Sequence, residues 1–322
     1  MAEGNGKQIL FKYNKAGKNP IQIGAIGKGA SEYLTCSYFA VLEAKDRVYI
    51  NGKPNTVLVY NTNGEFIRSF RFKNSSLRFN QMEIFDNGHL FLAQKGVGSN
   101  IEHLWSISDT LGNIVSQKKN TLPTFQTNIG SKGGVFQSGE GFSYWIDHND
   151  TIFSISPNFS FRPSYVFTLG EHRWSNKNVN VYSLKEHIEK RKKFYTPHFF
   201  IETQKYLISQ YAFKEKNSYV FLNKETHKTL TCDFNWKTTI REGIPNNFDN
   251  GIMFNVESYF NQGQSEFLIG VIFPYQLKAH VASDAFKNST PLYPEKKKEL
   301  ERLANSLDQN DNPVLMLLEL KQ

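Results

Sequence analysis

Apolar residues in this sequence gather into short runs separated by turns rich in Asn, Asp and Gly. Three segments share one pattern, in which an apolar run is followed by Asn or Asp, two further residues, Gly and a second run. These segments are Ile9–Gly17, Val57–Gly64 and Leu104–Gly112. Asn and Asp tolerate the left-handed backbone conformation and Gly adopts it freely, so each segment is predicted to be a β-hairpin.

The hairpins are evenly spaced. Gly17, Gly64 and Gly112 lie 47 and 48 residues apart. A degenerate fourth copy, Thr151–Asn158, occupies the next expected place. A fifth copy, Ser218–Asn223, begins further along the sequence than the period predicts. The delay is explained by an insertion between Glu171 and Pro197, in which Ser183 and Glu186 fit a capping box that opens a short helix.

A second pair of strands is expected between successive hairpins. The pairs are Ser37–Glu43 with Val48–Asn51, Phe79–Ile84 with His89–Gln94, and Gly134–Gln137 with Phe142–Ile146. Four short strands in each period make up one propeller blade, whereas a β-sandwich, the structural rival, gives no reason for fixed spacing. We therefore predict a single all-β domain over residues 1–322. It is expected to be a six-bladed β-propeller whose first and last blades are incomplete or merged.

The C-terminal part departs from this period. Strands are expected at Gly251–Val256 and Glu266–Phe273, and a helix is expected from Pro294. Apolar residues recur there at helical spacing, namely Leu300, Leu303, Ala304 and Leu307. Short helical insertions are thus predicted near 183–195 and 294–307. The final apolar run, Pro313–Leu320, is predicted to be the strand that closes the ring and covers an exposed sheet edge.

Several segments resemble the six-bladed β-propeller proteins abundant in Bacteroidetes, which are relatives of the NHL-repeat propellers. The most specific segment is Asn310–Lys321. Gly24–Leu34 matches in part, with Ala30-Ser31 where the family has Pro-Gly, and the central Tyr144–Phe153 also fits. The resemblance spans essentially the whole chain. It implies the fold and a location in the periplasm or at the cell surface, and it implies no reaction.

The resemblance also raises a question about the N-terminus. Family members usually carry a lipoprotein or secretory signal and several first strands before a segment like Gln8–Tyr13, but this chain begins almost at that segment. Met1–Gly6 contains no hydrophobic region of a secretory signal, and no apolar run is long enough to span a membrane. Either the N-terminal part of the first blade is missing or the ring closes differently. A lipid anchor is expected in a full-length form.

Charge and cysteine content argue against two classes of function. The formal net charge is +8, from 38 basic and 30 acidic residues. Much of the excess lies in Lys190–Lys193 and Lys296–Lys298, which are expected to be solvated helix faces, so nucleic acid is not expected as a partner. Cys36 and Cys232 belong to no C-x-x-C motif, so free thiols are expected, with a single disulfide bridge as the alternative.

No catalytic or cofactor motif is evident. The spacing of Gly24, Gly27 and Gly29 fits neither a P-loop nor a dinucleotide-binding loop. The histidines do not cluster, and Asp308–Asn312 lacks the central Gly and closing Glu of a calcium loop. The most concentrated polar stretch, Asp147–Asp150, is interpreted as a turn, although His beside a carboxylate could transfer protons. We therefore assign no catalytic residue, metal ligand or cofactor.

Aromatic and cationic residues on predicted loops could form a binding rim, because Trp, Tyr and Arg are frequent anchors of recognition. The candidates are Tyr33, Trp145, His148, Arg173, Trp174 and His198; packing in the core is the alternative for the aromatic ones. We favour a non-catalytic, envelope-associated binding module whose ligand is a protein, peptide or glycan. The alternative is a propeller-type hydrolase or lyase with its site in the central funnel.

Overall fold

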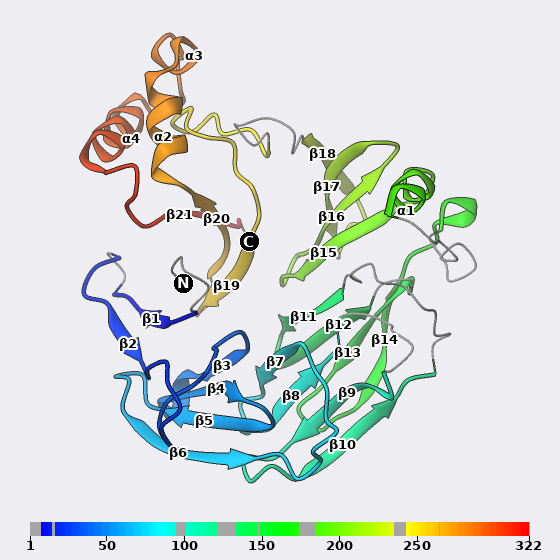
Figure 1. Cartoon of the computed structure of the whole chain (residues 1–322). Coiled ribbons are helices and arrows are strands. Elements are labelled where there is room, and N and C mark those ends of the chain that lie inside the picture. The colour runs from blue at the N-terminus through cyan, green and yellow to red at the C-terminus, as the bar shows by residue number, and fades with distance from the viewer. Residues whose placement is uncertain are drawn as a thin grey trace. The chain divides into compact units, whose positions relative to one another are not determined.

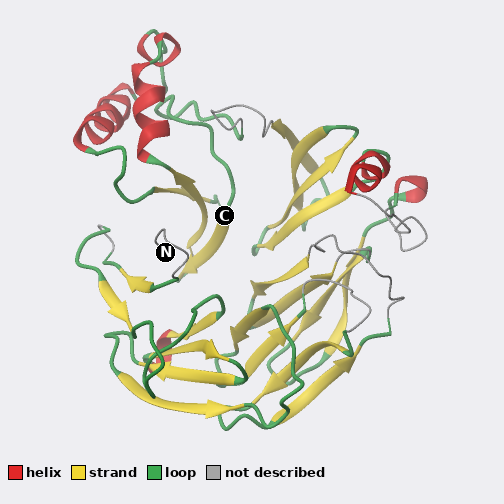
Figure 2. Cartoon of the chain, in the orientation of Figure 1, coloured by secondary structure: helices red, strands yellow, loops and turns green. Residues whose placement is uncertain are grey.

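A computed structural model describes residues 8–14, 17–94, 101–121, 133–146, 149–173, 184–234, 243–263 and 265–321. The chain divides into two compact units, Met1–Arg191 and Lys192–Gln322. Figures 1 and 2 show that strands dominate each unit and that the helices are few.

The N-terminal unit consists of antiparallel sheets in chain order. Its strands are β1 (Leu10–Lys12), β2 (Ile21–Ile23), β3 (Phe39–Leu42), β4 (Arg47–Lys53), β5 (Thr56–Tyr60), β6 (Phe66–Arg71), β7 (Gln81–Ile84), β8 (Leu90–Ala93), β9 (His103–Ser108), β10 (Ile114–Lys119), β11 (Gly133–Ser138), β12 (Gly141–Ile146), β13 (Thr151–Ile155) and β14 (Phe161–Val166). The first two strands pair with each other, and β3–β6, β7–β10 and β11–β14 each form a four-stranded sheet. Its helices are η1 (Glu43–Lys45), η2 (Gly170–His172) and α1 (Leu184–Arg191).

The C-terminal unit contains two sheets and a helical insertion. Its strands are β15 (Thr196–Glu202), β16 (Tyr206–Phe213), β17 (Lys216–Asn223), β18 (Thr229–Phe234), β19 (Ser258–Gln262), β20 (Ser265–Ile272) and β21 (Val314–Glu319). The sheet β15–β18 has four strands, and β19, β20 and β21 form a three-stranded sheet. Between β20 and β21 lie α2 (Pro274–Ala282), α3 (Asp284–Lys287) and α4 (Pro294–Ser306), which are drawn together in orange and red in Figure 1.

The predicted hairpin turns join the third and fourth strands of successive sheets. In the turn between β5 and β6, Asn61 Oδ1 accepts two backbone N–H groups at 3.0 and 2.9 Å, and Gly64 has a φ of 86°. Asp109 and Gly112, with a φ of 84°, repeat this arrangement between β9 and β10. Between β13 and β14, Phe159 occupies the place of the glycine at a φ of 68°. The repeat in the sequence is therefore a repeat of one turn geometry.

Two of these turns also press against the preceding sheet. A Cβ atom at Gly64 would lie 2.2 Å from the carbonyl oxygen of Gln22, and one at Gly112 would lie 2.0 Å from that of Arg71. No side chain fits at such distances without a shift of backbone. The glycines are therefore needed for the contact between sheets as well as for the left-handed conformation.

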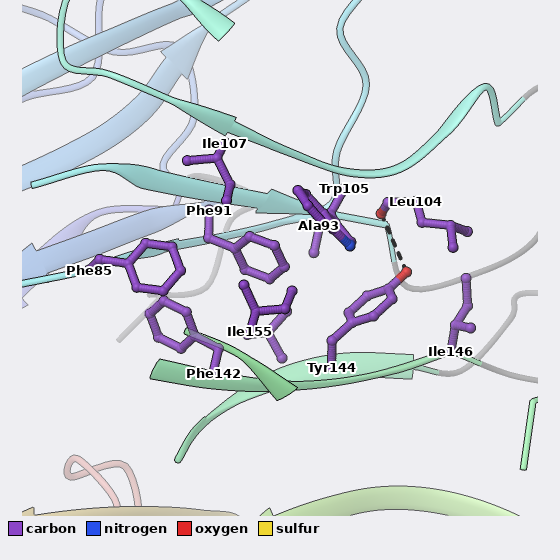
Figure 3. Packing of buried hydrophobic residues seen from close by; sticks show 11 residues of the cluster. Phe85, Phe91, Ala93, Leu104, Trp105, Ile107, Phe142, Tyr144, Ile146 and Ile155 are labelled. Carbon is purple, nitrogen blue, oxygen red and sulfur yellow. Dashed lines mark hydrogen bonds between the residues drawn. The ribbon is translucent and has the colours of Figure 1, made fainter. Parts of the chain in front are cut away.

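Successive sheets of the N-terminal unit pack face to face. One apolar cluster joins the sheet β7–β10 to the sheet β11–β14 (Figure 3). In it the rings of Phe91 and Phe142 stack at 5.8 Å, and the buried Tyr144 hydroxyl donates to the carbonyl oxygens of Gln94 (2.9 Å) and Leu104 (3.3 Å). A second cluster joins β3–β6 to β7–β10 in the same way, and the first strands of neighbouring sheets lie side by side. This is how propeller blades pack, and the chain is an all-β protein of the β-propeller type.

The number of blades differs from the prediction of six. The described residues form four four-stranded sheets and one three-stranded sheet, which are five blades. Of the first predicted blade, the described residues contain β1 and β2. These two strands pair with each other and form a separate two-stranded sheet.

Most predicted elements are confirmed, with two exceptions. The insertions contain α1 and α4 near the expected positions, and Pro313–Leu320 contains β21, which pairs with β20. The predicted strand at Gly251–Val256 is wrong, because only Phe254 pairs there, in an isolated bridge to Ile244. The helices α2 and α3 were not predicted. Both cysteines are free thiols, so the alternative of a disulfide bridge is wrong.

Candidate functional site

The six candidate rim residues lie in different surroundings. Tyr33 is fully buried; its hydroxyl donates to the carbonyl oxygen of Ile23 (3.1 Å) and accepts from the backbone N–H of Leu10 (3.3 Å). Burial raises the pKa of this phenol. These contacts favour the packing alternative for Tyr33. His148 and Trp174 lie outside the described residues.

Two other candidates share one neighbourhood in the N-terminal unit. Trp145 is buried at the end of β12, and its indole N–H donates to the carbonyl oxygen of Asn149 (3.1 Å). Arg173 is nearly half exposed and pairs with the adjacent Asp150 at 3.1 Å. His198 lies half-buried on β15, in the C-terminal unit. The structure thus brings Trp145 and Arg173 together around one turn.

A polar cavity in the C-terminal unit was not predicted from the sequence. It has a volume of about 200 Å³ and is lined by Gln204, Lys205, Glu225 and Glu266. We call it the carboxylate pocket. The turn between β15 and β16 supplies the first two side chains, the turn between β17 and β18 supplies Glu225, and β20 supplies Glu266.

Glu266 is the most buried polar residue of this pocket, with 5% of its surface exposed. Its Oε1 atom accepts hydrogen bonds from the backbone N–H of Gln204 (2.7 Å) and from the Tyr259 hydroxyl (2.6 Å). Its Oε2 atom makes no hydrogen bond or ion pair with the described residues. The two donors fix the carboxylate, and one acceptor atom is left available at the cavity.

A buried ion pair borders the pocket. Lys224 Nζ lies 3.0 Å from Glu202 Oε1 and donates to the carbonyl oxygen of Thr203 (2.8 Å). Only 9% of the Glu202 side chain is exposed. Lys224 directly precedes Glu225, and Glu202 lies two residues before Gln204, so this pair holds the two turns together.

The electrostatics of the pocket keep its tyrosine protonated. Burial raises the pKa of Tyr259, and its hydrogen bond to Glu266 together with the negative charges of Glu266 and Glu202 raises that pKa further. The phenol therefore acts as a hydrogen-bond donor near neutral pH. No group of three or more His, Cys, Asp or Glu side chains in the described parts of the chain is arranged to hold a metal ion. The pocket is suited to holding a polar ligand by hydrogen bonds.

Two exposed pairs of aromatic rings lie in the C-terminal unit, one within the helical insertion and one between the insertion and the segment before β19. Phe248 and Tyr293 lie 4.5 Å apart, with 48% and 46% of their surfaces exposed. Phe273 and Tyr275 lie 5.8 Å apart, with 41% and 53% exposed. The first pair is held by a backbone hydrogen bond from Tyr293 to Phe248 (2.9 Å). We call these four residues the exposed aromatic pairs.

The sequence contains one signal for the pocket, in the alternation of residues along β20. Along β20, burial alternates from residue to residue, and the inward positions are Glu266, Leu268, Gly270 and Ile272. A carboxylate at an inward position of an otherwise apolar face must find partners inside the protein. The exposed aromatic pairs gave no such signal, because exposed and buried aromatic residues look alike in a sequence.

Fold and site together define a β-propeller protein with a polar pocket and an aromatic surface. The chain belongs to the family described as "Domain of unknown function (DUF4934)", whose model matches residues 3–319. No curated protein matches the chain.

Comparison with solved structures agrees with the fold. A protein of Bacteroides fragilis assigned as an exported protein matches with a TM-score of 0.71 and 18% sequence identity, over 98% of this chain and 85% of that chain. A member of the DUF4221 family from Bacteroides vulgatus matches with a TM-score of 0.42 and 12% identity, over 72% and 79%. Virginiamycin B lyase of Staphylococcus aureus matches with a TM-score of 0.41 and 11% identity, over 81% and 70%. Among the described residues, every helix is too short or too polar to cross a lipid bilayer.

Proposed function

We propose that this protein is a non-catalytic binding module of the cell envelope, with a protein, peptide or glycan as its ligand. The exposed aromatic pairs carry this proposal. Aromatic rings left in water forgo the stabilisation of burial, about 25 cal/mol for each Å² of apolar surface. Grouped exposed rings mark surfaces that another molecule covers, and aromatic anchors supply much of the energy of such contacts.

The lysine-rich runs support a ligand other than nucleic acid. Lys190 pairs with Glu186 at 2.9 Å, and Lys296 pairs with Glu299 at 2.8 Å, each within one helix. A groove for nucleic acid needs cations that are free to neutralise phosphates. Lys190 and Lys296 instead form ion pairs on partly exposed faces of α1 and α4.

Location and architecture are part of the same proposal. The resemblance to envelope proteins of Bacteroidetes and the likeness to an exported Bacteroides protein support a place in the periplasm or at the cell surface. We also propose one NHL-like domain over residues 1–322, in which β1 and β2 represent a reduced sixth blade. Arg173, whose side chain is nearly half exposed, is proposed as a secondary contact of the ligand.

A binding screen with matched variants tests the function. The purified chain is probed with peptide libraries and glycan arrays, and each hit is repeated with F248S/Y293S, Y275S and the control L230S. Leu230 lies on β18 of the same unit and is 69% exposed. Loss of an aromatic anchor is expected to weaken binding about tenfold or more, since anchors contribute ~2 kcal/mol or more. The control is expected to bind like the wild type.

Two results would contradict the proposal. Full-strength binding by both aromatic variants would show that the exposed aromatic pairs are not the contact surface. Turnover of a lactone, phosphodiester or oligosaccharide by the wild-type chain would instead establish the alternative, a hydrolase or lyase.

A further inference from the structure

Most polar side chains that line the carboxylate pocket are not engaged in hydrogen bonds or ion pairs with the described residues. The side chains of Gln204, Lys205 and Glu225 make no hydrogen bond or ion pair with the described residues; the Lys205 ammonium lies 5.9 Å from the centre of the Tyr206 ring. Three unpaired polar groups around one cavity are free to bind a ligand.

The buried Glu266 carboxylate gives the pocket a fixed acceptor. Its Oε1 atom is held by two donors, at 2.7 and 2.6 Å, while its Oε2 atom has no partner among the described residues. Oε2 is accessible from the cavity. A ligand hydroxyl can therefore take the place of water there and donate a hydrogen bond to this charged acceptor.

The charges around the cavity select the class of ligand. An anion would face the Glu225 and Glu266 carboxylates, and a cation would face the Lys205 ammonium with the Lys224 ammonium nearby. A neutral ligand with several hydroxyl groups avoids both conflicts, because each hydroxyl can donate to a carboxylate and accept from an ammonium or amide N–H.

The volume of the pocket agrees with a small polyhydroxylated ring. About 200 Å³ corresponds to about seven water molecules at ~30 Å³ each, which is room for one sugar residue. We infer that the carboxylate pocket binds a single sugar residue, held by Glu266 and Glu225 as acceptors and by Lys205 and Gln204 as donors. The inference rests on the proposed binding function and narrows its ligand to a glycan.

Titration calorimetry with the whole chain tests this inference. The probes are D-glucose, D-galactose, D-mannose and N-acetyl-D-glucosamine, with L-lysine methyl ester as a cationic comparison. We expect at least one sugar to bind with an affinity that salt does not change, because screening acts on charged ligands. E266Q is expected to weaken binding about tenfold or more, as loss of a charged acceptor does.

Matched variants separate local from general effects. E301Q and K298M change the same residue types on α4 and are expected to bind like the wild type, whereas K205M is expected to weaken binding several-fold. The glutamine of E266Q can still accept from its two protein donors, and a thermal melt checks that it folds. If it does not fold, E225Q and K205M test the same pocket at residues that have no structural bonds to lose.

Three results would overturn the inference. They are binding of none of the four sugars, sugar binding that E266Q, E225Q and K205M leave unchanged, and salt-sensitive binding of the lysine ester in place of a sugar. If none of the four sugars binds, the proposed function still holds, provided that the peptide screen finds a ligand whose binding is lost in F248S/Y293S. Failure of both screens rejects the proposed function as well.

Discussion

The contact between the β9–β10 turn and the preceding sheet makes Gly112 the most sensitive glycine of the repeat. G112A is expected to meet two costs. The first is the left-handed conformation at a φ of 84°, which costs an L-residue about 1–2 kcal/mol, offset in part by the lower entropy of the unfolded chain. We take the net value as about 1 kcal/mol.

The second cost comes from the close approach of backbone. The new Cβ would lie 2.0 Å from the Arg71 carbonyl oxygen, so the turn must move away from the end of β6. That movement breaks the hydrogen bond from the Lys73 N–H to the Gly112 carbonyl (2.9 Å) and the one from Arg68 to the Thr110 carbonyl (2.8 Å). At about 1 kcal/mol for each bond, the total for G112A is about 3 kcal/mol.

G139A provides the matched control. Gly139 has a φ of 56°, and a Cβ there would meet no atom within 4 Å, so only the conformational cost of about 1 kcal/mol remains. Urea unfolding followed by circular dichroism measures both variants. We expect G112A to lose about 2 kcal/mol more than G139A, the value of two hydrogen bonds. Equal losses would refute the packing of this turn on the preceding sheet.

Three further predictions concern single side chains. F159A keeps the positive φ of 68° and loses the packing of the ring, so it should destabilise the fold by about 3 kcal/mol. F159G should cost ~0.5–1 kcal/mol less, because glycine adopts the left-handed conformation without strain. Equal melting temperatures of the two variants would contradict backbone strain at this position. K224M removes the ammonium that pairs with the buried Glu202 carboxylate and should cost about 3–5 kcal/mol. K216M removes an exposed pair and should change the unfolding free energy by less than about 1 kcal/mol. The raised pKa of Tyr259 predicts a stability that is complete below the unfolded-state pKa of about 10 and is lost as pH rises toward the folded-state pKa. Y259F should therefore flatten the fall in unfolding free energy measured by urea titration above that pH, and an unchanged slope would contradict this assignment.

The propeller architecture could be predicted because local signals recur. Asn61 with Gly64 and Asp109 with Gly112 form turns whose geometry depends on four successive residues, and their spacing gives the period of the sheets. The false strand at Gly251–Val256 shows the limit of this reasoning. Ile252, Phe254 and Val256 are buried and Met253 is exposed, so the segment alternates like a strand although only Phe254 pairs.

The functional groups could not be located in the same way, because contacts between distant segments create them. Tyr33 and Trp145 were chosen as aromatic residues on predicted loops, yet both are buried. The carboxylate pocket joins residues that are 62 positions apart, as in the hydrogen bond from Gln204 to Glu266. No spacing rule in the sequence links such positions.

The repeat itself explains why the pocket lies where it does. In the β5–β6 and β9–β10 turns the glycine packs against the backbone of the preceding sheet. The corresponding β17–β18 turn is one residue longer: the N–H of His227, at a φ of 57°, bonds to the Asn223 carbonyl oxygen (2.9 Å). Within this longer turn lie Lys224, which pairs with Glu202, and Glu225, which lines the carboxylate pocket. Where the turn keeps its standard length it contributes to packing, and where it gains a residue it presents charged groups to a cavity.

Deleting Thr226 should therefore restore the shorter turn and abolish sugar binding while the β15–β18 sheet persists. A shortened chain that still binds sugar would show that the longer turn does not build the pocket.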